Sequence, residues 1–234
     1  MHGIALGGAA CAASALLAYS VRGRSSTLLA PSVYRGSRQR RAIALTFDDG
    51  PSEGTNQLLE TLHRLDTPAT FFVCGMNVKR LPDVVRATAA AGHEIGNHSY
   101  SHPALYFRSP RFISAELEAA QSIIADTTGK APSLFRAPFG ARWFGLRQAQ
   151  RELDLLGVMW TVLGRDWKLS AADIARRVES RTRNGAIICL HDGRGIERNP
   201  GIGETLEAVK QLIPALRSRG FTFETVTQLL CPTN

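Results

Sequence analysis

Two histidines and two adjacent carboxylates are the residues of this sequence best suited to chemistry. His98 and His102 are four residues apart, so one helical turn or a tight loop would aim both imidazoles at one point. Asp48 and Asp49 follow an apolar run, where two charges are costly unless something binds them. Three protein ligands of these types form an open metal site that keeps a position for water. We therefore predict a metal site in which one aspartate is a ligand and the other stays free.

A free carboxylate and a further histidine would make this site a hydrolase. Metal-assisted hydrolysis needs a cation that polarises the carbonyl and the water, and a base that takes the proton. His191 ends a second apolar run and is the natural general acid for a leaving amine. Asp166 or Asp192 could orient His191 and raise its pKa, and Arg136 could pair with Asp48 and keep it ionised.

Each of these residues also has a plainer interpretation. Asp49 precedes Gly50 and Pro51, which together favour a turn. A single histidine at the end of a buried run is often structural. Phe139 and Trp167 offer flat apolar faces for a sugar ring, but simple core packing would use the same residues. The catalytic interpretation is favoured because the polar residues all fall at the carboxyl ends of predicted strands, where parallel α/β folds gather their active sites.

The elements that must position these residues alternate along the chain from Ala42. The predicted strands cover residues 43–47, 69–74, 93–96, 134–136, 158–162, 186–190 and 221–225. The predicted helices cover residues 55–65, 81–91, 114–127, 145–156, 171–182 and 205–219. About seven strand–helix units imply a parallel sheet covered by helices, either as a barrel or as an open sheet.

The positive charge of the chain is concentrated in one short segment. Residues 20–41 contain no Asp or Glu and six arginines, namely Arg22, Arg24, Arg35, Arg38, Arg40 and Arg41. Removing these six from the 28 basic residues leaves 22, against 20 acidic residues. The charge therefore gives no reason to expect a nucleic-acid-binding core. We interpret residues 21–41 as an Arg-rich linker and residues 42–234 as one catalytic domain.

An apolar segment precedes this linker. Residues 4–19 form an apolar run. The run is shorter than a membrane span, which needs about 20 residues, and slightly longer than the apolar core of a signal peptide, which has about 7–15 residues. We interpret residues 1–20 as a targeting or anchoring segment, which predicts membrane association or export to the cell envelope. The arginines after it favour the opposite orientation, with the domain facing the cytoplasm. The orientation is left open.

The four cysteines do not suggest a metal site of their own. No C-x-x-C pair is present among Cys11, Cys74, Cys189 and Cys231, so a cysteine-based zinc site is not expected. Cys74 and Cys189 lie inside apolar runs and are predicted to be small buried thiols.

Taken together, the motifs resemble those of polysaccharide deacetylases, the NodB-homology group of carbohydrate esterase family four. The resemblance runs from about residue 41 to residue 230. The matching motifs occur in the order of the family and are TFDDGP at 46–51, HSYSH at 98–102, RAPFG at 136–140, RDW at 165–167 and LHD at 190–192. The resemblance implies a distorted (β/α) barrel of about seven parallel strands.

The resemblance also implies a metal and a base. A divalent metal, most commonly zinc with cobalt as the alternative, would be held by Asp49, His98 and His102. Asp48 would act as the general base for a metal-bound water that attacks an acetamide carbonyl, and Arg136 would orient Asp48.

The remaining roles implied by the resemblance concern the leaving group and the substrate. His191 would protonate the departing amine and would be oriented by Asp166. The backbone N–H of Phe139 would bind the oxyanion, and Leu190 would line the pocket for the acetyl methyl group. Trp167 is expected to contact the sugar.

The expected function is hydrolysis of a linear amide, the removal of N-acetyl groups from a GlcNAc-containing glycan such as chitooligosaccharide or peptidoglycan. The expected partner is an acetylated amino-sugar polymer or oligomer, without nucleic acid, and the chain is expected to be a monomer. One alternative is an O-acetyl esterase acting on a xylan-type polysaccharide through the same site. Another is a non-catalytic glycan-binding protein of the envelope, which would have lost metal ligands or Asp48; this sequence retains both.

Overall fold

A computed structural model describes residues 2–231, and for residues 2–10 it describes the backbone alone. Met1 and residues 232–234, at the two ends of the predicted segments, lie outside the described residues. The strands are β1 (Ser32–Val33), β2 (Ala42–Gly50), β3 (Thr70–Val73), β4 (Glu94–Asn97), β5 (Leu134–Phe135), β6 (Leu156–Val158), β7 (Val162–Leu163), β8 (Ile187–His191) and β9 (Thr222–Phe223). The helices are α1 (His2–Arg22), α2 (Thr55–Arg64), α3 (Gly75–Arg80), α4 (Pro82–Ala90), α5 (Pro110–Thr128), the 3₁₀ turn η1 (Pro138–Gly140), α6 (Leu146–Glu152), α7 (Ala171–Arg181), α8 (Gly203–Ser218) and α9 (Val226–Leu230).

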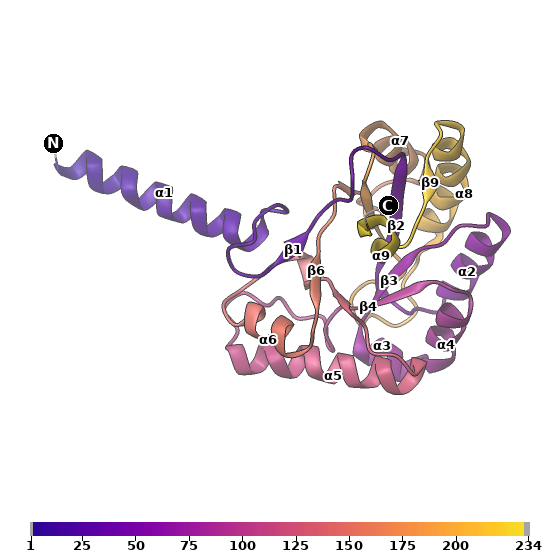
Figure 1. The fold of residues 1–234 in the computed structure, drawn as a ribbon, viewed down its shortest axis with the longest axis horizontal. Helices are drawn as coiled ribbons and strands as arrows, with labels where there is room; N and C mark the ends of the chain where they lie inside the picture. Colours follow the sequence, from indigo (N-terminus) through magenta and orange to yellow (C-terminus); the bar gives the residue numbers. More distant parts are fainter. Residues whose placement is uncertain (1, 232–234) are drawn as a thin grey trace.

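The strands form one parallel sheet that curls into part of a barrel, with helices around its outside (Figure 1). Their order is β1-β6-β5-β4-β3-β2-β8-β7, and β9 pairs with β2. The predicted distorted (β/α) barrel is therefore confirmed. The predicted strand at 158–162 divides into β6 and β7, which lie at different places in the sheet.

The pairing of β2 with β8 sorts polar from apolar side chains. Thr46 is the register partner of Cys189, and Asp48 is the partner of His191. Because successive side chains of a strand point to opposite faces, these four polar residues share one face. The residues between them face the other way: Phe47, partnered with Leu190, belongs to the main hydrophobic cluster.

That cluster fills the layer between the sheet and helices α2, α7 and α8. It includes Leu58 and Leu62 of α2, Val178 of α7 and Leu212 of α8, all buried. Full burial of one such side chain contributes about 1.5–3 kcal/mol relative to exposure. The outer layer therefore holds β2 and β8 in place within the sheet, and their polar face is positioned accordingly.

The Arg-rich segment lies against the sheet over much of its length. Within it, β1 pairs with β6, with Val33 beside Val158. The guanidinium of buried Arg142 donates to the carbonyl oxygens of Ser26 and Gly23. Farther along, the backbone N–H of Gly36 donates to the carbonyl of Gly185 just before β8, at 2.8 Å. These contacts bind the segment to both sides of the open barrel; the domain boundary at residue 42 stays a prediction.

The segment before it forms helix α1, which extends away from the rest of the molecule (Figure 1). At its end, the backbone N–H of Arg142 donates to the carbonyl of Val21 at 3.0 Å. Among the described residues, no helix is both long and apolar enough to cross a membrane. Membrane association and export stay predictions.

Candidate active site

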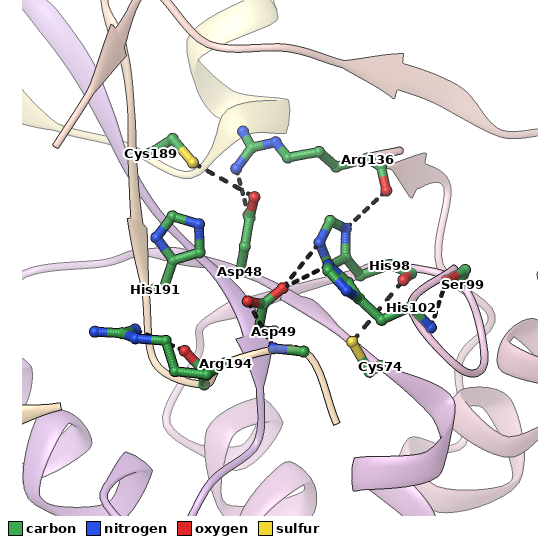
Figure 2. Close-up of polar contacts among 12 residues, drawn as sticks. Asp48, Asp49, Cys74, His98, Ser99, His102, Arg136, Cys189, His191 and Arg194 are labelled. Carbon is green, nitrogen blue, oxygen red and sulfur yellow. Dashed lines mark hydrogen bonds and ion pairs between the residues drawn. The ribbon is translucent and has the colours of Figure 1, made fainter. Parts of the chain in front are cut away.

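Asp49, His98 and His102 meet at the carboxyl ends of β2 and β4 (Figure 2). Oδ1 of Asp49 lies 3.2 Å from Nε2 of His98 and 3.0 Å from Nε2 of His102. One ligand atom from each residue lies within 4.8 Å of the others. Three converging ligands, with no fourth among the residues that the structure describes, fit an open site for a divalent metal.

The loop that carries both histidines is fixed by its neighbours. The backbone N–H of Ser99 donates to Oδ1 of Asn97 at 2.8 Å. From helix α5, Glu116 accepts hydrogen bonds from the backbone N–H groups of Tyr100 and Ser101 at 3.1 and 2.8 Å. The Glu116 carboxylate also accepts the Ser101 hydroxyl at 2.8 Å. A single carboxylate thus holds the turn between the two imidazoles.

The ligand atoms are oriented by contacts on their far sides. Nδ1 of His98 lies 2.7 Å from the backbone carbonyl of Arg136, which leaves Nε2 directed at Asp49. Oδ2 of Asp49 accepts the backbone N–H of Gly195 at 2.9 Å, which leaves Oδ1 for the histidines. Such outer contacts are typical of metal-binding histidines and carboxylates. Burial alone would raise the pKa of Asp49, but the hydrogen bonds from His102 and His98 lower it well below its usual range. Asp49 is therefore an anion at neutral pH.

Asp48 lies beside this group and is held by a buried arginine. Nη1 of Arg136 lies 2.6 Å from Oδ1 of Asp48 and 2.7 Å from Oγ1 of Thr46. The guanidinium is fully buried and lies over the ring of Phe72 at 4.1 Å. Oδ2 of Asp48 accepts the thiol of Cys189 at 3.4 Å. The predicted pairing of Arg136 with Asp48 is present.

His191 approaches Asp48 from β8 and is held by Asp166. Nδ1 of His191 lies 2.8 Å from Oδ1 of Asp166, whose Oδ2 accepts the backbone N–H of His191 and the Thr205 hydroxyl, each at 2.8 Å. Burial alone would lower the pKa of His191, but the hydrogen bond and charge of Asp166, with smaller contributions from Asp48 and Asp49, raise it to about 9. His191 is therefore a cation at neutral pH, with Nε2 free to give up a proton.

The sequence left open whether Asp166 or Asp192 orients His191, and the structure brings Asp166 to it. Oδ2 of Asp192 instead accepts the Thr55 hydroxyl at 2.7 Å. Burial raises the pKa of Asp192 to about 7. Its carboxylate lies against Gly50, where an added Cβ would meet Oδ2 at 2.2 Å. Asp192 thus supports the turn after β2.

Two exposed aromatic rings border the group of polar residues. Phe139 is 58% exposed, and its ring lies 4.8 Å from that of His102. Its φ of 57° is in the left-handed region, which places it on a sharp turn in η1. Trp167 is 49% exposed, and its ring lies edge-on to His191 at 5.1 Å. The two rings therefore project from opposite sides of the site rather than packing in the core.

The structure corrects one sequence-based expectation and adds a residue. Leu190 is 0% exposed and packs in the main hydrophobic cluster, so it does not line a pocket. Because side chains alternate along β8, Cys189 shares the face of His191 and faces Asp48 in its place. The signal was in the sequence, since Cys189 stands two residues before His191. Thr205 of α8 donates its hydroxyl to Asp166, and no nearby sequence pattern indicated this role.

Known proteins resemble this chain in sequence and in fold. The family model described as polysaccharide deacetylase matches residues 35–158. A chitooligosaccharide deacetylase of Bradyrhizobium sp. is 37% identical over 198 residues, which cover 81% of this chain and 90% of that protein. The peptidoglycan-N-acetylglucosamine deacetylase PgdA of Listeria monocytogenes is 34% identical over 206 residues, which cover 87% of this chain but 42% of that protein. This chain thus spans less than half the length of the Listeria relative.

A solved structure of a deacetylase also resembles this chain in fold. The crystal structure of the Bc1960 peptidoglycan N-acetylglucosamine deacetylase, in complex with a hydroxamate-type benzamide, superposes with a TM-score of 0.80. It is 30% identical in sequence, and the match covers 84% of this chain and 91% of that one.

Proposed function

The chain belongs to the polysaccharide deacetylase family, and we propose that it removes N-acetyl groups from GlcNAc units of a glycan, such as chitooligosaccharide or peptidoglycan. One observation carries the proposal: the group Asp49, His98 and His102 lies beside a carboxylate, Asp48, and a histidine, His191, that is held in its protonated form. This arrangement supplies a metal site, a base and an acid in one place, as amide hydrolysis requires.

We assign the metal to Asp49, His98 and His102. The donor set of two imidazoles and one carboxylate suits zinc, and cobalt is the alternative. When bound, the ion would polarise the acetamide carbonyl and lower the pKa of a water. The residues themselves keep the ligand atoms in place, since His98 is held by the carbonyl of Arg136 and Asp49 by the N–H of Gly195.

Asp48 takes the proton of the attacking water. Arg136 engages Oδ1 of Asp48, so Oδ2 is the oxygen left for this proton. The paired guanidinium also fixes the orientation of the carboxylate. The water oxygen adds to the carbonyl carbon, and the backbone N–H of Phe139 is assigned to the developing oxyanion.

His191 completes the reaction at the leaving nitrogen. Its Nδ1 is occupied by Asp166, so Nε2 donates the proton to the nitrogen as the carbon–nitrogen bond breaks. The products are acetate and the free amine of the sugar. Trp167 and Phe139, exposed on either side, offer their faces to the sugar ring.

The experiment is acetate release by the purified full chain from chitooligosaccharides, peptidoglycan and acetylated xylan. Each substrate is tested after chelation and again after zinc or cobalt is added back. Metal-restored release from a GlcNAc substrate supports the proposal. Release from xylan alone would contradict it in favour of ester hydrolysis, and no release with metal bound would contradict it altogether.

A further inference from the structure

A second group of metal-ligating side chains lies next to the first. Asp48, Cys189 and His191 each offer a ligand atom, and these atoms lie within 4.8 Å of one another. Sγ of Cys189 is already 3.4 Å from Oδ2 of Asp48. None of the three belongs to the group of Asp49, His98 and His102 (Figure 2).

The register of the sheet makes this group stable. Asp48 and His191 are direct partners across β2 and β8, and Cys189 is two residues before His191 on the same face. Two of the three side chains therefore come from one strand and the third from its neighbour, and each of these two strands is paired on both sides. A ligand set built on rigid strands needs little rearrangement to bind an ion.

Hydrogen bonds to residues outside the group occupy one ligand atom of His191 and one of Asp48, and leave the other atom available. Asp166 occupies Nδ1 of His191, which leaves Nε2, and a carboxylate behind a histidine is the usual support of a zinc ligand. Arg136 occupies Oδ1 of Asp48, which leaves Oδ2. Sγ of Cys189 has that same Oδ2 as its partner.

The charges also suit a divalent cation. With a Cys189 thiolate and a neutral His191 ring, the thiolate, Asp48 and Asp166 carry three negative charges, and Arg136, the partner of Asp48, carries one positive charge. Binding would release two protons to solvent: the sulfur–hydrogen bond of Cys189 and the Nε2–hydrogen bond of His191 break as the sulfur–metal and nitrogen–metal bonds form. A thiolate, an imidazole and a carboxylate together favour soft or borderline ions over magnesium or manganese.

We propose that Asp48, Cys189 and His191 form a second, inhibitory site for a soft or borderline divalent cation such as Zn²⁺ or Cd²⁺, filled after the first site. The inhibition rests on the proposed function, because a cation there removes the base Asp48 and the acid Nε2 of His191 together. The second ion binds more weakly than the first, since it approaches a cation already held by Asp49 and its two histidines.

The test is a cadmium titration of the full chain followed by ultraviolet absorption of the cadmium–thiolate bond. The parent protein carries Cys11→Ser and Cys231→Ser, which removes the two exposed thiols. The parent should bind a second equivalent with a thiolate band. Cys189→Ala and Cys189→Ser should each lose that band and that equivalent but keep the first equivalent, which also shows that they fold. Cys74→Ala, which removes the other buried thiol, should keep the band.

Acetate release then tests the inhibition. Excess zinc should inhibit the parent, excess manganese should not, and each Cys189 variant should lose the zinc inhibition relative to its own zinc-limited rate. A single equivalent in the parent, or an unchanged band in the Cys189 variants, would overturn the proposal even in an active enzyme. Two equivalents with the expected thiolate band but no acetate release would leave this site standing and overturn the deacetylase function.

Discussion

Asp166 holds His191 through both of its carboxylate oxygens. Oδ1 contacts Nδ1 of the ring and Oδ2 accepts the backbone N–H of the same residue, each at 2.8 Å. Ring and backbone are therefore fixed by one buried anion, and the free Nε2 has a single direction. The charge that results on the ring has a measurable consequence.

The first prediction concerns the pKa of His191, which is raised to about 9. Burial opposes the charge, and Asp166 more than offsets it. The pKa of His191 in the folded state lies above its ordinary value of 6.5, so protonation of His191 stabilises the fold. This stabilisation is fully present below pH 6.5 and is lost as the pH rises through about 9. Proton NMR titration of the metal-free chain should find His191 cationic at pH 7.5.

Asp166→Asn supplies the comparison for that titration. Without the carboxylate, the pKa of His191 should fall toward its ordinary value, and the alkaline limit of acetate release should move to lower pH with it. An unchanged titration in Asp166→Asn would show that Asp166 is not the cause.

The second prediction separates the base from the metal. Asp48→Asn keeps the shape of the side chain but removes its ability to take a proton. It should bind metal like the unmodified chain and lose about 100- to 10,000-fold in turnover. Metal content by atomic emission and acetate release are measured on the same samples. A rate near that of the unmodified chain would remove Asp48 from this role.

The third prediction concerns the metal ligands. His98→Ala and His102→Ala should each lose the first equivalent of zinc, because two protein ligands remain where three converge. His63→Ala, which changes an exposed histidine on α2, is the matched control and should bind zinc normally. Full zinc occupancy in both ligand variants would refute the assignment.

Much of this arrangement could be predicted from the sequence because it depends on local patterns. Short β-rich runs located β2, β3 and β8, and the carboxyl ends of these strands gathered the polar residues at one edge. The features that the sequence did not predict depend on strand register or on contacts between residues far apart in the sequence. The sequence predicted Leu190 at the site, but Leu190 packs in the main hydrophobic cluster and its neighbour Cys189 faces the site instead. The docking of residues 23–41 depends on Arg142 and Gly185, more than a hundred residues away.

The fourth prediction concerns stability. Arg136 is fully buried and pairs with Asp48, so Arg136→Met would leave a buried carboxylate without its partner. The free energy of unfolding should fall by about 3–5 kcal/mol in urea titrations. The double variant Arg136→Met/Asp48→Asn removes the unpaired charge and should recover part of that loss. If both proteins lost the same amount, packing around Phe72 rather than charge would explain the effect.

The fifth prediction concerns the loop between the two histidines. Glu116→Ala removes three hydrogen bonds to Tyr100 and Ser101, and should weaken metal affinity by about 10- to 100-fold with the ligands themselves intact. Glu118→Ala changes an exposed acid on the same helix and should leave affinity unchanged. Affinity is measured by competition with a chromophoric chelator. Equal affinities in the two variants would show that Glu116 does not position the loop.

Metal-dependent deacetylation with Asp48 as the base is tested most directly by acetate release from chitooligosaccharides. The zinc-loaded full chain and zinc-loaded Asp48→Asn are measured side by side at one zinc per chain. We expect release by the first, its loss on chelation, and almost none by the second at equal zinc content. Equal release by both proteins, or no release by the unmodified chain with its zinc bound, would contradict this mechanism.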